Sequence, residues 1–131
     1  MEEIHSYTFG KNEKLCSKIL IEKVFKEGAS IRCNNLVIKY LIGEFELPSS
    51  CQVLISIPKK NIRTAVKRNL MKRRIREAYR LHKHDMIQML ATKNKNMLLC
   101  IIFIPKFTLE YKNIEQNIIQ ITDNFKSLLS T

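Results

Sequence analysis

The chain has 131 residues, of which 45% are hydrophobic and 27% are charged, and its 23 Lys and Arg residues exceed its 12 Asp and Glu residues to give a formal net charge of +11. This composition is typical of one globular domain with a core of its own and excludes a disordered tail. The longest apolar run, Met97–Ile104, is too short to span a bilayer, and the acidic N-terminus has no signal-peptide pattern. We therefore expect a single domain over residues 1–131 in the cytoplasm.

The first half of the chain predicts one helix and three strands. Residues 1–13 are polar, and we expect them to form a flexible arm. A helix is predicted over Lys18–Glu27, because Ser17 can cap its start, Gly28 can end it, and its apolar residues repeat on one face. Alternating apolar residues, bounded by turn-forming ones, predict the three strands. They are Ala29–Arg32, Leu36–Ile42 and Cys51–Ile57.

The second half predicts two long helices around one strand. Ala65–His82 forms the first, with Thr64 as its N-cap, and His84–Thr92 either continues it or forms a separate helix. The continuous apolar run Met97–Ile104 is typical of a central strand buried on both faces. Tyr111–Leu129 has the periodicity of an amphipathic helix. The order α-β-β-β-α-β-α predicts an α/β (α+β) two-layer sandwich with a four-stranded sheet.

The helix Ala65–His82 lies in the most basic part of the chain. From Lys59 to Lys83 there are eleven basic residues and one acidic residue, Glu77. At 100° per residue, one helical face carries Asn69, Lys72, Arg73, Arg76, Arg80 and Lys83. The opposite face carries Leu70, Met71, Ile75, Ala78 and Tyr79, which can dock on a core. So many like charges with so few acidic partners indicate a polyanion as the ligand of this face.

Three other interpretations of this basic helix stay open. The charged face could simply be solvated, or it could belong to a ribosomal or general nucleic-acid-binding module. It could also bind anionic lipid at a membrane surface, although its apolar side lacks the Trp and Phe residues typical of an interfacial helix.

The sequence contains no recognisable catalytic or metal-binding arrangement. The four cysteines show no CxxC spacing, and we expect free thiols, buried or partly buried, at Cys16, Cys33, Cys51 and Cys100. His82 and His84 point about 200° apart on a helix, so they are not expected to share a metal ion. No pair of carboxylates and no Ser/His/Asp set is evident. We predict no catalytic residue and no metal ligand on the protein.

Two segments of the chain carry a family signature. They read Ser56-Ile-Pro-Lys-Lys60 and Ala65-Val-Lys-Arg-Asn-Leu-Met-Lys-Arg-Arg-Ile-Arg-Glu77. They resemble the signature of the protein subunit of bacterial ribonuclease P, which reads S-V-S-K-K and, after a short spacer, A-V-x-R-N-R-x-K-R-x-x-R-E. The pattern F-x-x-V-F-x-x-G of that family's first helix is partly met by Ile21, Val24, Phe25 and Gly28. The resemblance extends from about residue 9 to residue 129.

Three features of this chain differ from the family pattern. Leu70 stands where the third residue of the Arg-Asn-Arg triplet is basic. The spacer between Lys60 and Ala65 is one residue longer and lacks the glycine turn. Lys39 stands where the second strand often carries an aromatic residue, and Ile21 replaces the first Phe of the helix pattern.

The resemblance implies a small protein that joins one large catalytic RNA and helps to remove the 5′ leader from precursor tRNA. The RNA would carry the chemistry with Mg²⁺, and the protein alone would bind no cofactor. The implied state is a monomer, one protein per RNA, without a membrane partner. The family fold also implies a left-handed β-α-β crossover through the basic helix, against the usual preference.

The resemblance also implies two RNA-binding surfaces. The residues expected to bind the catalytic RNA are Arg68, Asn69, Lys72, Arg73, Arg76 and Arg80. A groove between the first helix and the sheet is expected to bind the single-stranded leader through Ile21, Phe25, Lys39, Ser56 and Lys60. The alternative for Ile21 and Phe25 is a place in the core between helix and sheet. Tyr40 and Tyr79 are expected in the core or at its edge.

Overall fold

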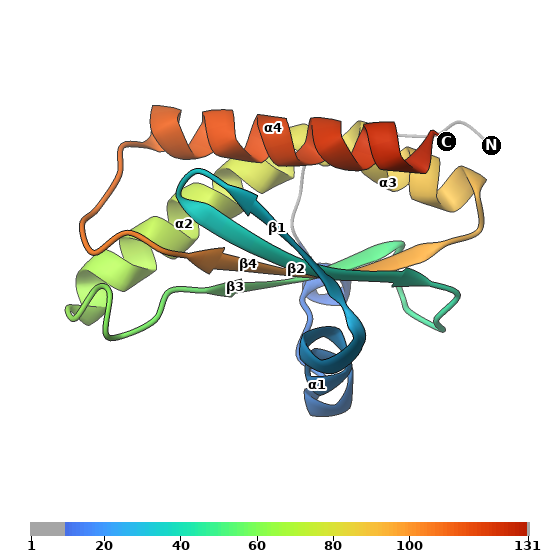
Figure 1. Ribbon diagram of the computed structural model, residues 1–131, viewed down its shortest axis with the longest axis horizontal. Coiled ribbons are helices and arrows are strands. Elements are labelled where there is room, and N and C mark those ends of the chain that lie inside the picture. Colours follow the sequence, from blue (N-terminus) through green and yellow to red (C-terminus); the bar gives the residue numbers. More distant parts are fainter. Residues whose placement is uncertain (1–9, 131) are drawn as a thin grey trace.

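The computed structural model describes residues 10–130, which form a four-stranded sheet with helices on both faces (Figure 1). In chain order the elements are a 3₁₀ turn (Lys11–Glu13), α1 (Lys18–Glu27), β1 (Ala29–Cys33), β2 (Leu36–Gly43), β3 (Cys51–Ser56), α2 (Ala65–His82), α3 (His84–Thr92), β4 (Asn96–Phe103) and α4 (Tyr111–Leu129). The predicted mixed α/β order is confirmed. The bounds of α1, α2 and α4 are as predicted, the strand ends differ by one residue, and α3 is a separate helix.

The sheet has the strand order β1-β2-β4-β3. β2 is antiparallel to β1 and to β4, whereas β3 and β4 are parallel. β4 lies between two strands and is buried along most of its length, which explains its continuous apolar run. The predicted central strand is therefore confirmed. α2 and α3 connect the parallel pair β3 and β4, and the left-handed sense of this crossover stays a prediction.

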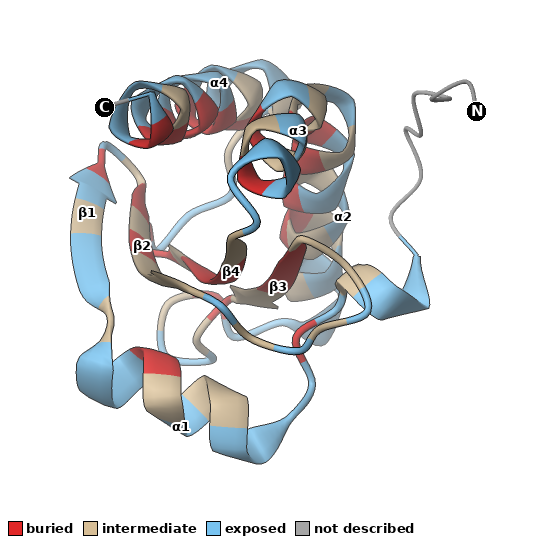
Figure 2. Cartoon of the chain, turned by 90° about the vertical axis from the view of Figure 1, so that its right-hand side faces the viewer, coloured by how far each residue is buried: buried red, intermediate tan, exposed pale blue. Residues whose placement is uncertain are grey.

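The main core lies between one face of the sheet and the helices α2, α3 and α4 (Figure 2). Alternate residues of the strands point into it, because side chains of a strand alternate between faces. Tyr79 is buried there, and the half-buried Tyr40 packs edge-to-face on Phe125 with ring centroids 4.9 Å apart. The expected core positions of Tyr40 and Tyr79 are confirmed.

The other face of the sheet is covered in part by α1, which adds a partial third layer to the sandwich (Figures 1 and 2). Val24 of α1 and Leu15 form a small buried cluster there with Leu98 and Cys100 of β4. Most of the rest of this face is half-buried or exposed, so it is the part of the sheet that a ligand can reach.

Gly28 ends α1 as predicted, but it does so without the left-handed conformation that favours glycine. Its φ of −78° is not left-handed, so any residue could adopt its backbone conformation. A Cβ atom at Gly28 would instead lie 2.5 Å from the carbonyl oxygen of Val24 and 2.6 Å from that of Tyr40. Glycine is required because two backbone segments meet at this point.

The N-terminal segment is docked on the edge strand β3 wherever the structure describes it. The backbone N–H of Leu15 donates to the carbonyl oxygen of Val53 at 2.9 Å, and the side chain of Gln52 donates to the carbonyl oxygen of Asn12 at 3.0 Å. Residues 10–13 are therefore not the loose arm that their polarity predicts. Residues 1–9 of the predicted arm lie outside the described residues.

Lys83 does not lie on the charged face of α2, which corrects the helical-wheel prediction. It joins α2 to α3, is 3% exposed, and forms an ion pair with Glu13 of the N-terminal segment. The regular helix ends at His82, so the wheel no longer gives the direction of the next side chain. This ion pair connects the N-terminal segment to the end of the basic helix.

Candidate nucleic-acid interface

α2 docks on the core through the apolar face that its periodicity predicts. Met71, Ile75, Ala78 and Tyr79 are buried, and Leu70 is partly buried against the same core. Leu70 occupies the position where the signature has a basic residue. Its side chain contributes to packing instead of presenting a charge. Thr64 begins the helix as predicted, but its side chain makes no capping hydrogen bond.

The opposite face of α2 is open to solvent. Asn69, Arg73 and Arg76 are exposed, and Lys72 is half-buried. Lys72 and Arg76 also line a small cavity of about 190 Å³ with Lys14 and Cys16 of the docked N-terminal segment. This face therefore continues past the helix onto the segment that covers β3.

Arg80 differs from its neighbours because it is paired within the helix. Its guanidinium group donates to both carboxylate oxygens of Glu77, at 3.0 and 2.7 Å. These hydrogen bonds hold the pKa of Glu77 below its usual range and raise the pKa of Arg80 above its own. The one acidic residue of α2 thus compensates the charge of Arg80.

Arg68 and Arg74 fasten loops to α2. Arg68 donates from Nη1 to the carbonyl oxygens of Ile62 and Arg63, at 3.0 and 2.7 Å. Arg74 donates to the carbonyl oxygen of Leu109 in the loop before α4. Sequence reasoning assigned Arg68 to RNA and overlooked Arg74. The spacing of Arg74 could have predicted this inward position, because it lies four residues from both Leu70 and Ala78 on the apolar side of the helix.

Four of the five residues predicted for the leader groove lie on the α1 side of the molecule. Ile21 packs on the small cluster there, and Phe25 is 45% exposed, so Phe25 is not a core residue. Lys39 and Ser56 point to the same side, because the alternating residues of β2 and β3 face α1 at these positions. The alternative of a core position therefore does not hold for Phe25.

Lys39 links the strand surface to the exposed ring of α1. Its ammonium group lies 5.7 Å from the centroid of the Phe25 ring and donates to Ser30 Oγ at 3.2 Å. Burial raises the pKa of the neighbouring Cys100 thiol to about 11, against a smaller opposing effect of the Lys39 charge. The surface therefore combines one cation with one exposed aromatic ring.

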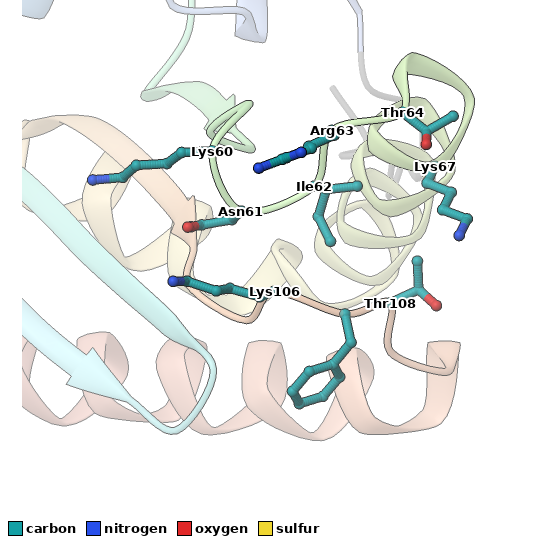
Figure 3. Close-up of a pocket in the computed structure, with 9 residues that line it drawn as sticks. Lys60, Asn61, Ile62, Arg63, Thr64, Lys67, Lys106 and Thr108 are labelled. Atoms are coloured by element: carbon teal, nitrogen blue, oxygen red, sulfur yellow. The ribbon is translucent and has the colours of Figure 1, made fainter.

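Lys60 lies elsewhere, in the loop between β3 and α2. It lines a cavity of about 560 Å³ that sequence reasoning did not predict (Figure 3). The other residues of this cavity come from the same loop, from the first turn of α2 and from the loop before α4: Asn61, Ile62, Arg63, Thr64, Lys67, Lys106, Phe107 and Thr108.

The histidines and cysteines have structural surroundings. His82 Nε2 lies 2.9 Å from the carboxylate of Glu115, so it joins α2 to α4. Three of the predicted free thiols are buried, whereas Cys16 is exposed. Across residues 10–130, no three His, Cys, Asp or Glu side chains gather in a way that could hold a metal ion. That the protein binds no metal by itself stays a prediction.

None of the helices in residues 10–130 is both long and apolar enough to cross a membrane.

The chain is similar to known proteins over almost its whole length. The family model described as Ribonuclease P matches residues 9–126. The ribonuclease P protein component of Porphyromonas gingivalis is 32% identical over 126 residues, which cover 92% of each chain. That of Borreliella burgdorferi is 34% identical over 105 residues, covering 80% of this chain and 82% of the relative.

Two solved structures share the fold. The RNase P protein of Staphylococcus aureus superposes with a TM-score of 0.69 at 20% identity, covering 88% of this chain and 97% of the other. The RNase P protein from Thermotoga maritima gives a TM-score of 0.64 at 20% identity, covering 86% and 96%.

Proposed function

The chain belongs to the ribonuclease P protein family, and on this premise we propose that it is an RNA-binding subunit with two RNA surfaces. Membership in the family implies a role in 5′ processing of tRNA. In our proposal, the exposed face of α2 binds the catalytic RNA, and the α1 side of the sheet binds the single-stranded leader of precursor tRNA. One protein chain serves one RNA.

The observation that carries this proposal is the division of α2 into two faces. One face is buried in the core, so the helix is held rigidly, while Arg73 and Arg76 extend into solvent on the other. The planar fork of an arginine matches two oxygens of a phosphate, and a rigid helix keeps several such forks in register. A folded RNA presents phosphates in a fixed arrangement, and a preformed cationic surface suits such a ligand.

The second surface supports the leader assignment by its chemistry. Single-stranded RNA is bound by stacking its bases on aromatic rings beside positive charge, with little demand on sequence. Phe25 is exposed and Lys39 lies over its ring. A base stacked on Phe25 would leave its phosphate within reach of the Lys39 ammonium group.

The protein side chains act by binding and orientation in this proposal. The described residues do not offer a carboxylate cluster suited to Mg²⁺, so we derive no magnesium step on the protein. Magnesium held by the RNA subunit would supply the activated water and the charge stabilisation for phosphodiester hydrolysis. The protein would contribute by holding the RNA and the leader of its substrate together.

A cleavage assay tests the proposal. The protein is added to its cognate RNA subunit at limiting magnesium, and cleavage is followed for precursor tRNAs with a leader of several nucleotides and with a leader of a single nucleotide. We expect faster cleavage and a preference for the substrate with the longer leader. A general nucleic-acid-binding module would bind both RNAs without stimulating cleavage, and that result would overturn the proposal.

A variant on the α1 side tests the leader surface separately. Lys39→Ala should weaken binding of leader-bearing precursor tRNA more than that of mature tRNA, because only the former reaches the surface beside Phe25. Equal weakening of both substrates would contradict this placement, while leaving the role of α2 intact.

A further inference from the structure

The cavity between the β3–α2 loop and the loop before α4 is strongly basic. Four of its nine lining residues are cationic, and none is acidic: Lys60, Arg63, Lys67 and Lys106. All four are exposed. Figure 3 shows the charged ends of Lys60, Arg63 and Lys106 extending to one side of the cavity and Lys67 lying on the other. Cations that line one cavity repel each other, so an anionic ligand would relieve a cost that the free protein bears.

An aromatic residue also lines the cavity. Phe107 is 64% exposed, although the neighbouring Pro105 is buried. A large exposed ring beside several cations is the arrangement that single-stranded nucleic-acid sites use, with a base on the ring and a phosphate on the charges. A site for phosphate alone would not need the ring.

Both loops that form the cavity are held in place by hydrogen bonds. Asn61 donates to the carbonyl oxygen of Phe103 at the end of β4, at 3.2 Å. Arg68 holds the carbonyl oxygens of Ile62 and Arg63, and Arg74 holds that of Leu109. The cavity is therefore preformed, and a ligand would lose little free energy to loop ordering.

We propose that this cavity binds one nucleotide of single-stranded RNA, with its base stacked on Phe107 and its phosphate held by Lys60, Arg63 and Lys106. The site is distinct from both the exposed face of α2 and the surface beside Phe25. Its volume of about 560 Å³ lies within the range of small-ligand sites. A base within a duplex is stacked on its neighbours, so only an unpaired nucleotide can enter. The choice of RNA as the ligand rests on the proposed function.

Binding of a short RNA tests this site without any cleavage reaction, so its failure would not affect the proposal on tRNA processing. The ligand is a fluorescently labelled single-stranded RNA of about eight nucleotides, compared with a ribose-phosphate oligomer of the same length without bases. Measured in the Phe25→Leu background, so that stacking on the α1 side does not contribute, the added substitution Phe107→Leu should weaken binding of the RNA by roughly fivefold or more. It should leave binding of the base-free oligomer unchanged. Equal effects on both oligomers, or no effect on either, would overturn the stacking assignment.

Within residues 10–130 one other phenylalanine is exposed, Phe25, and it offers a matched control. Phe25→Leu removes a ring from the α1 side and leaves the cavity intact. A photo-reactive RNA carrying 4-thiouridine should cross-link to residues 106–108 in the wild type and in Phe25→Leu, and should lose this cross-link in Phe107→Leu. Absence of cross-links at residues 106–108 in the wild type would overturn the site. Both phenylalanines are exposed, so circular dichroism should show that both variants fold.

Two further titrations, one with the catalytic RNA and one with leader-bearing precursor tRNA, identify which RNA supplies the nucleotide. If it belongs to the catalytic RNA, Phe107→Leu should weaken assembly with that RNA and leave leader recognition unchanged. If it belongs to the leader, the variant should weaken only binding of leader-bearing precursor tRNA. Unchanged affinity in both titrations would overturn the site as a functional one.

Discussion

Arg73 and Arg80 lie about two turns apart on α2, and their guanidinium groups have different surroundings. Arg73 is exposed and forms no ion pair within residues 10–130, whereas Arg80 donates twice to Glu77. A paired guanidinium must give up or share its partner before it can bind a phosphate. The two residues therefore differ in what they offer to RNA, although they share one face of the helix.

This difference predicts unequal effects of two alanine substitutions. Arg73→Ala should weaken binding of the catalytic RNA by about tenfold and reduce the magnitude of the salt slope by about 0.7–0.9, the value for one phosphate contact. Arg80→Ala should weaken binding less, because the guanidinium group that it removes is shared with Glu77 and is only partly available to a phosphate. Titrations of each variant with the catalytic RNA at several salt concentrations measure the affinity and the salt slope. Equal losses would contradict the assignment of Arg80 to Glu77.

The cysteines give a second prediction at the scale of single residues. Burial raises the pKa of the Cys51 thiol to about 12 and that of Cys100 to about 11, and burial also raises the pKa of Cys33. Each therefore stays protonated and unreactive at about pH 8, whereas Cys16 is exposed. Brief alkylation of the native protein should add one group, at Cys16, by mass spectrometry. Unfolding should make all four react, and native labelling at Cys51 would contradict this burial.

The N-terminal segment acts as an element of the fold through its contacts with β3 and α2. Leu15 is buried on the sheet, and the ion pair between Glu13 and Lys83 connects the 3₁₀ turn to the junction of α2 and α3. Lys83 is almost completely buried, so its charge depends on a nearby carboxylate for compensation. The position of the basic helix is thereby coupled to the segment that precedes α1.

Breaking this pair on one side should destabilise the protein. Glu13→Gln removes one charged partner of a buried ammonium group, and we expect a loss of about 3 kcal/mol in the free energy of unfolding. Urea denaturation measures this loss. The double variant Glu13→Gln, Lys83→Met serves as the control, because it removes both charges and should recover part of the loss. If the losses in unfolding free energy of Glu13→Gln and of Lys83→Met, measured singly, add up to the loss of the double variant, the two residues are not coupled.

The charge of the whole molecule is unevenly distributed. The net charge of the chain is +11, and the segment from Lys59 to Lys83 alone contains eleven basic residues and one acidic residue. The structure folds this segment into the loop of the basic cavity and the helix α2, so its cations lie in one region of the molecule. Long-range attraction of RNA should therefore be directed to one region of the molecule.

This distribution predicts a steep salt dependence of RNA binding. If about five phosphates are neutralised, the logarithm of the association constant should fall by about 4 for each tenfold rise in salt. Titrations of the catalytic RNA in monovalent salt, at constant magnesium, measure the slope. A slope near zero would show that the cationic region is solvated and does not bind phosphate.

Much of the fold follows from local patterns in the sequence. The bounds of α2 and α4 come from apolar residues that repeat every three or four positions, and the central place of β4 comes from its continuous apolar run. The two faces of α2 follow from the same periodicity, so Arg73 and Arg76 were identified as exposed cations from the sequence. These features depend on residues within one or two turns of each other.

Tertiary structure decided the features that join distant residues. Gly28 is required because the backbone of Tyr40 crosses it, and Lys83 turns inward to meet Glu13. Phe107 reaches the cavity of Lys60 only because α2 holds both loops. The sequence by itself determined the periodicity and the charge of each element, because these depend on neighbouring residues. Which loops meet, and which cations are paired, depends on how all elements pack, and no local pattern encodes that.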